Sequence, residues 1–396
     1  MKWSSAVSEK TSLSEAVEEC ALKVREDLGG DRPDLVVGFV SAEHEPKYDS
    51  VTALVREALD GRVFIGCCGG GVVGEGREVE HRAGFSLTAA VLPNVELTPF
   101  HLEDGDMPDA DAPPDSWEEL VGTAADTSPH FLLMADPFSI RGEHLVMGLD
   151  YAFPTGAKIG GLASGGRQPG GNSLFLDDRV LRSGAVGITM HGDIAVDTVV
   201  AQGCRPIGQV MHITSCERNE LLEVDGRTPF EVLKELFETL SDRDRELAQH
   251  SLFLGVVMDE LIDEPGLGDF LVRNIVGLDP KRGTLAIGEV LKEGQTVQFH
   301  LRDARTSIED LQALLTRYVD GRPVHGESGA LLFSCLGRGS YLYGRPDQDT
   351  DLFRETVGPL PLTGFFCNGE IGQVGGSTYL HGYTSSFGIF RPKSRE

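Results

Sequence analysis

The sequence lacks any apolar run of the roughly 18 residues that a membrane-spanning helix needs. Its first ten residues, Met1–Lys10, contain no apolar stretch of the kind found in secretory signals. We therefore expect a cytoplasmic protein that neither crosses nor coats a membrane.

Basic residues are also scarce relative to acidic ones. The chain has 35 Lys and Arg against 62 Asp and Glu, for a formal net charge of −27. Such a surface repels phosphate backbones and anionic lipid, and this excludes nucleic-acid and membrane-surface binding as expected functions. The plain consequence of the charge is an acidic, soluble surface.

Motifs for disulfides, metals and nucleotides are missing as well. The cysteines do not have the spacing of a disulfide scaffold, and the sequence contains neither a CxxC pair nor an HExxH motif. No glycine turn ends in the Gly-Lys-Ser/Thr of a P-loop or opens a helix as a dinucleotide-binding GxGxxG does. We expect reduced thiols, no metal and no cofactor. The odd set of seven cysteines is Cys20, Cys67, Cys68, Cys204, Cys216, Cys335 and Cys367.

Glycine, by contrast, is abundant, with 49 residues in 396, where an average chain has about 7%. The glycines are spread through apolar segments, as happens where loops turn sharply or backbones approach closely.

One pattern recurs along the chain. A buried strand leads through a loop and a helix to a second strand that ends in a glycine-rich turn, with about 30 to 35 residues from the first strand to the turn, the size of a βαβ unit. Stretches rich in β-formers follow each turn, at 84–92, 172–190 and 377–390. The three copies cover residues 35–75, 130–166 and 330–372, and a weaker fourth copy is predicted to start at Leu252–Met258.

Shorter signals complete the outline. Helices are predicted over 14–28, 50–59 and 143–153, and from about Ser116. A hairpin is predicted around Asp279–Gly283, and the charged segment Asp242–Glu246 is predicted to be a solvated helix surface. We therefore predict an α/β fold of two related halves with mixed sheets and packed helices, built from repeated strand-helix-strand units that end in Gly-rich turns.

Five motifs occur in order along the chain: Gly66-Cys-Cys68, Gly160–Gly166, Gln202–Gly208, Gly364–Gly372 and Leu380–Phe387. Together they resemble the motifs of the FIST proteins, named for F-box and intracellular signal transduction. The resemblance covers nearly the whole chain and implies a FIST N-terminal domain over 1–208 and a FIST C-terminal domain over 209–396. It further implies a sensory module for a small ligand, with amino acids or their derivatives suggested, that acts through a separate signalling partner.

Glycine turns and charged residues inside apolar motifs are the candidate ligand-binding groups. A glycine turn points backbone N–H groups at a carboxylate or phosphate, although the same glycines also serve tight turns and close strand packing. A guanidinium and a carboxylate at one sheet end would bind the carboxylate and the amino group of a zwitterion, or would form a buried ion pair that fixes a loop. The candidates are Gly160, Gly161, Ser164, Gly165, Arg205, Arg338, Asn368, Glu370 and His381.

An enzyme is the main alternative, as a cysteine-dependent hydrolase or transferase acting on a small amide or thioester. Cys335 or Cys367 would be the nucleophile, and His381, His325 or His81 the base. Because no catalytic-cysteine signature is present, each cysteine is more readily explained as a small buried apolar side chain. A protein-interaction scaffold is the third hypothesis, and it would require a large exposed apolar patch. We favour the non-enzymatic sensor.

Overall fold

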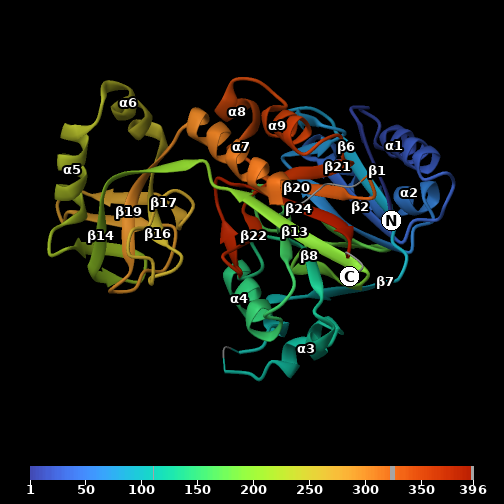
Figure 1. Cartoon of the computed structure of the whole chain (residues 1–396), viewed down its shortest axis with the longest axis horizontal. Coiled ribbons are helices and arrows are strands. Elements are labelled where there is room, and N and C mark those ends of the chain that lie inside the picture. The colour runs from blue at the N-terminus through green and yellow to red at the C-terminus, as the bar shows by residue number, and fades with distance from the viewer. Residues whose placement is uncertain (110, 322–325, 394–396) are drawn as a thin grey trace. The chain divides into compact units, whose positions relative to one another are not determined.

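A computed structural model describes all residues except 110, 322–325 and 394–396. The described chain forms two compact units (Figure 1). Unit 1 comprises Met1–Val200 and Gln312–Glu396, and unit 2 comprises Ala201–Leu311. Mixed sheets and packed helices of the predicted α/β class are confirmed.

The three predicted copies all lie in unit 1, and each provides a pair of parallel strands at the centre of its own six-stranded sheet. In the first sheet β2 pairs with β3, in the second β8 with β9, and in the third β20 with β21. Their apolar, almost wholly buried sequences explain this, because a strand covered on both faces needs apolar residues at every position. The bounds are Leu35–Ser41 for β2, Val63–Gly69 for β3, His130–Ala135 for β8, Lys158–Leu162 for β9, Gly329–Cys335 for β20 and Leu362–Cys367 for β21.

Each sheet is completed by strands in the same relative positions. A returning strand runs antiparallel to the first strand of the pair, and a further strand lies outside it. The returning strands are β6 (Phe85–Val91), β12 (Ala185–Gly192) and β24 (Ser385–Pro392). The outer strands are β1 (Lys2–Ser8), β7 (Val95–Leu102) and β13 (Ile194–Ala201).

The hairpin that follows each glycine turn leaves its own sheet and extends another one. The hairpin after β3 joins β21 of the third sheet, the hairpin after β9 joins β3 of the first, and the hairpin after β21 joins β9 of the second. The exchange is cyclic, so that each copy depends on the other two. These hairpins are β4–β5 (Gly71–Gly74, Arg77–Glu80), β10–β11 (Leu174–Leu176, Arg179–Leu181) and β22–β23 (Glu370–Val374, Ser377–His381).

Helices connect the strands of each copy. Figure 1 shows α1 and α2 together over the first sheet, and α1 buries Leu13, Val17 and Val24 against that core. Ser12 begins α1 as its N-cap, and its side chain accepts the Glu15 N–H. The helices are α1 (Leu13–Asp27), α2 (Val51–Ala58), α3 (Asp115–Val121), α4 (Gly142–Ala152), α8 (Gly339–Tyr343) and α9 (Gln348–Thr356), with the 3₁₀ segments η1 (Ala42–Ser50), η2 (Asp104–Asp106) and η3 (Ala125–Thr127).

Unit 2 is a closed antiparallel barrel with its own apolar core. The predicted hairpin is confirmed as β17–β18, but the predicted fourth copy is wrong. Its strand β16 pairs antiparallel with both of its neighbours, so it does not start a βαβ unit. In barrel order the strands are β14 (Cys204–Glu217), β15 (Glu220–Val224), β18 (Thr284–Ile287), β17 (Phe270–Asp279), β16 (Leu252–Val257) and β19 (Thr296–Arg302). The helices are α5 (Pro229–Thr239), α6 (Asp242–Ser251) and α7 (Ala304–Gly321). The chain passes back into unit 1 within α7.

Candidate functional site

The carboxyl ends of β3, β9 and β21 meet in unit 1, and Ser164 holds them together. The Ser164 N–H donates to the Cys68 carbonyl at 3.2 Å, and its hydroxyl accepts the Gly70 N–H at 2.9 Å while donating to the Phe366 carbonyl. One serine therefore binds the ends of all three copies. We call the residues 68–70, 164–165 and 366–368, together with Glu370, the strand-end cluster.

The surface of this cluster is partly open. Asn368 is exposed, and Ser164, Gly165 and Gly70 are half-buried. A Cβ on Gly70 would lie 2.5 Å from a methyl carbon of Leu336, so the Leu336 side chain, which is 42% exposed, lies directly over this turn. The Gly70 N–H is taken by the Ser164 hydroxyl, so the exposed Asn368 side-chain amide is the donor at this surface suited to a small anionic group.

Glu370 belongs to the cluster and is fully buried. Its Oε2 accepts the Thr384 N–H at 3.1 Å and the Thr384 hydroxyl at 2.9 Å. Its Oε1 has no hydrogen-bond partner among the described residues. Burial raises the pKa of this carboxyl to about 8, against the opposing effect of the Thr384 bonds. A carboxyl poised near neutral pH with one unpartnered oxygen is typical of functional sites.

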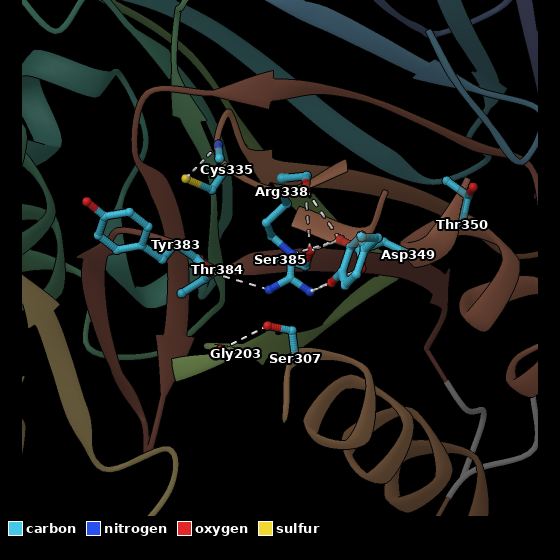
Figure 2. A network of polar contacts seen from close by, with 12 residues as sticks. Gly203, Ser307, Cys335, Arg338, Asp349, Thr350, Tyr383, Thr384 and Ser385 are labelled. Atoms are coloured by element: carbon cyan, nitrogen blue, oxygen red, sulfur yellow. Dashed lines mark hydrogen bonds and ion pairs between the residues drawn. The ribbon is translucent and has the colours of Figure 1, made fainter. Parts of the chain in front are cut away.

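Arg338 is engaged in a buried ion pair. Its guanidinium donates to the Asp349 carboxylate through Nε at 2.9 Å and Nη2 at 3.0 Å, and Nη1 donates to the Tyr383 carbonyl at 3.4 Å. Figure 2 shows the side chain between the Tyr383–Ser385 segment and Asp349. Burial opposes ionisation of Asp349, but the Arg338 charge keeps the pKa of that carboxyl below its ordinary value. Arg338 therefore fixes a loop, one of the two roles its sequence context allowed.

Glu78 of β5 anchors α9 next to this pair. Its carboxylate accepts the backbone N–H groups of Asp347 at 3.2 Å and of Asp349 and Thr350 at 3.1 Å each. Burial, together with the nearby Asp349 charge, raises the pKa of Glu78 to about 8. A strand of the first copy thus positions the helix that carries Asp349. Sequence reasoning missed both Glu78 and Asp349, because neither stands out from the many other acidic residues.

The remaining candidates are engaged in close packing, hydrogen bonds or ion pairs. Gly160 and Gly161 are inside β9 and serve close packing: a Cβ on Gly160 would lie 1.9 Å from the Leu133 carbonyl oxygen, and one on Gly161 would lie 2.5 Å from Cys367 Sγ. His381 is buried in β23, and its Nε2 lies 3.1 Å from the Gly372 carbonyl oxygen. Arg205 belongs to unit 2, where it forms ion pairs with Asp244 and Asp303.

The two candidate nucleophiles differ. Cys367 is fully buried, its thiol contacts the Phe365 carbonyl, and burial raises its pKa well above the ordinary value, which disfavours a thiolate. Cys335 is half-buried at the end of β20. Of the proposed bases, His81 is exposed and His325 lies outside the described residues. Within the described ranges no three His, Cys, Asp or Glu side chains are grouped to hold a metal ion, and no helix there has the length and apolarity to cross a membrane.

Comparison with known proteins identifies the family. A FIST N domain matches residues 34–227 and a FIST C domain matches residues 229–373, so the chain belongs to the FIST family. The matched ranges meet near residue 228, whereas the compact units divide after residues 200 and 311. The division into domains at residue 208 stays a prediction.

Several relatives span the chain. It is 36% identical over 389 residues to the uncharacterized protein MT0656 of Mycobacterium tuberculosis, covering 97% of this chain and 98% of that protein. It is 35% identical over 378 residues to the uncharacterized protein Mb0898c of Mycobacterium bovis, covering 95% of each. An F-box/LRR-repeat protein of Arabidopsis thaliana, At5g63520, is 28% identical over 284 residues, which are 60% of this chain and 53% of that protein.

Among solved structures, a cyanuric acid hydrolase from A. caulinodans matches over 99% of this chain and 100% of its own, with a TM-score of 0.38 and 8% identity. That score is too low for the likeness to bear on function.

Proposed function

We propose that this protein is a non-enzymatic sensor that binds a small ligand, an amino acid or a derivative, at the strand-end cluster. The observation that carries the proposal is Glu370, a fully buried carboxyl with one unpartnered oxygen, close in sequence to the partly exposed strand ends that Ser164 joins. FIST domains are generally thought to be small-ligand sensory domains, which agrees with this assignment.

The chemistry of the cluster fits a zwitterion. An ammonium group against Glu370 Oε1 would supply the positive partner that the carboxyl lacks and would favour its ionised form. The ligand carboxylate would accept from the exposed Asn368 side-chain amide. Arg338, engaged with Asp349, would position the loop and would not touch the ligand. Arg205 and His381 stay sequence predictions with no role in this scheme.

Binding would act on the copies jointly, because the ligand would contact strand ends from all three. Leu336 covers Gly70 and its N–H donates to the Cys367 carbonyl at 2.9 Å, so admitting a ligand would move the segment that leads to Arg338. We propose that this movement is what a separate signalling protein detects.

Native mass spectrometry of gently purified protein, followed by calorimetry with the twenty amino acids, tests the proposal. We expect a bound amino acid or saturable binding, weakened at least tenfold by Asn368→Ala and by Glu370→Gln. Asn219→Ala, an exposed asparagine of unit 2, is the matched control and should leave the affinity unchanged. A ligand-free mass together with no binding by any amino acid would contradict the proposal.

A further inference from the structure

A cavity of about 290 Å³ lies in unit 1, at the amino end of β21. The strand-end cluster lies at the carboxyl end of that strand, so the two places are distinct. Five segments line the cavity: Trp3–Ser5 of β1, Lys23 and Asp27 of α1, the turn Glu75–Gly76, the α9 residues Thr350, Phe353 and Arg354, and the loop Gly358–Leu362.

One wall of the cavity is apolar and preformed. Trp3 and Phe353 are buried aromatic side chains, and Trp3 packs against Phe390 in a tilted arrangement with 5.1 Å between ring centroids. Pro359 and Pro361 restrict the backbone of the adjoining loop. A wall that is already ordered costs little conformational entropy when a ligand binds, which favours an apolar ligand body.

The acceptors in the cavity are already engaged. The Asp27 carboxylate accepts the Ser4 hydroxyl at 2.7 Å, and the Glu75 carboxylate forms an ion pair with Lys23. Lys23 and Arg354 are paired as well, with Glu75 and Asp351, but each has more N–H donors than these pairs use. An ammonium has three N–H donors and a guanidinium has five, and the Arg354 guanidinium lies close over the Gly76 turn, with Nη1 3.2 Å from the position of a Cβ there.

The indole N–H of Trp3 is a further hydrogen-bond donor among the residues that line the cavity. Its side chain is 8% exposed, and its indole Nε1–H has no hydrogen-bond partner among the residues the structure describes. An unsatisfied buried donor costs on the order of 1–3 kcal/mol, and a ligand oxygen that reached it would remove that cost.

We propose that this cavity binds a small organic carboxylate with an apolar body. Its carboxylate would contact Lys23 and Arg354, with an oxygen toward the Trp3 indole, and its body would pack on the proline wall. The volume has room for about ten water-sized groups at roughly 30 Å³ each, which fits an aryl-acetate or a short fatty acid. This site goes beyond the proposed sensor site and does not depend on it.

Tryptophan fluorescence tests this directly, because the chain has only Trp3 and Trp117. In the full-length Trp117→Phe variant, Trp3 is the sole reporter. The probes are phenylacetate, 3-phenylpropionate and hexanoate, with phenylacetamide and phenethylamine as ligands of the wrong charge. We expect saturable changes in Trp3 emission with the carboxylates, and at least tenfold weaker binding of the amide and the amine. Calorimetry on the unmodified protein replaces the fluorescence if Trp117→Phe does not fold.

Three arginine and lysine variants locate the binding. Lys23→Met and Arg354→Met should each weaken phenylacetate binding at least tenfold. Arg345→Met is the matched control, because Arg345 pairs with the same Asp351 as Arg354 but does not line the cavity. The proposal is overturned if no carboxylate binds the folded protein, or if the three variants bind equally well. Asn368→Ala should leave phenylacetate binding unchanged, so this result is independent of the sensor experiment.

Discussion

Arg338 and Asp349 form a bidentate ion pair in unit 1, with side chains only 0% and 2% exposed. Asp349 also accepts the Tyr343 hydroxyl at 2.8 Å and the Ser385 hydroxyl. The pair therefore links the end of β20, the start of α9 and the start of β24. Removing one member would leave a buried charge without its partner, which typically costs about 3–5 kcal/mol.

We expect Asp349→Asn to lower the free energy of unfolding by about 3–5 kcal/mol in urea titrations. Asp31→Asn, which removes the exposed partner of Lys2, is the control and should cost less than about 1 kcal/mol. The double variant Arg338→Met/Asp349→Leu removes both charges. Its loss of stability should be smaller than the sum of the losses of Arg338→Met and Asp349→Leu measured separately, because no charge is left unpaired. A cost for Asp349→Asn equal to that of the control would show that the pair does not hold these elements.

Glu370 predicts an unusual dependence of stability on pH. Its pKa is about 8 in the folded protein against an ordinary value of 4.5, so the folded state binds more protons than the unfolded state between these values. Stability should therefore fall as pH rises from about 4.5 to about 8, with a slope of up to about 1.4 kcal/mol per pH unit from this group. Glu78, raised to about 8 as well, should contribute in the same direction.

Urea unfolding at half-unit pH steps measures this effect. Glu370→Gln should flatten the slope between pH 5 and 8 and should be more stable than the unmodified protein at pH 8.5, where the buried carboxylate has become charged. The exposed Glu57→Gln should leave the slope as it was. If Glu370→Gln and the unmodified protein keep parallel profiles, Glu370 does not titrate as described.

Cysteine reactivity separates the sensor from the cysteine-enzyme alternative. Among the seven cysteines, only Cys216 and Cys335 are half-buried and the other five are buried. We expect a thiol reagent to label these two in the native protein and the others only after unfolding, as measured by peptide mass spectrometry. Rapid labelling of native Cys367 would mean that its thiol is accessible and would revive it as a nucleophile.

The sequence predicted the repeated units well but not how they combine. Runs such as Leu35–Val40 and Ala330–Cys335 show buried strands, and the glycine turns mark where they end. The exchange of hairpins between sheets has no local signal, because β4 and β10 are only four and three residues long and their partners lie far away in sequence. The same limit explains the error at Leu252: an apolar run looks alike in a parallel and in an antiparallel sheet.

The candidate site was predictable only in part. Glu370 and Arg338 stood out because burying a charged side chain within an apolar motif is costly unless the charge has a partner or a ligand. Asp349, the partner of Arg338, did not stand out, because it lies beyond a short helix in a segment with several acidic residues. Ser164 was expected to bind a ligand, whereas its hydroxyl is engaged in joining the three copies. Such roles depend on contacts across about 100 and 200 residues, which local sequence does not encode.

Three glycines at equivalent positions give the last prediction. Gly66, Gly160 and Gly364 lie in the second strand of each parallel pair, and a Cβ on each would lie 1.8–1.9 Å from the carbonyl oxygen of its partner in the first strand. Backbone atoms cannot yield as a flexible side chain can, so alanine at any of the three should separate the strands at the centre of its sheet. We expect each substitution to cost more than about 3 kcal/mol, or to prevent folding, as measured by thermal unfolding and by soluble yield. Gly105→Ala, with nothing within 4 Å of the added carbon, is the control and should change stability by less than about 1 kcal/mol. If one of the three alanine variants were as stable as this control, its copy would not be packed as the other two are, and the equivalence of the three copies would fail at that strand.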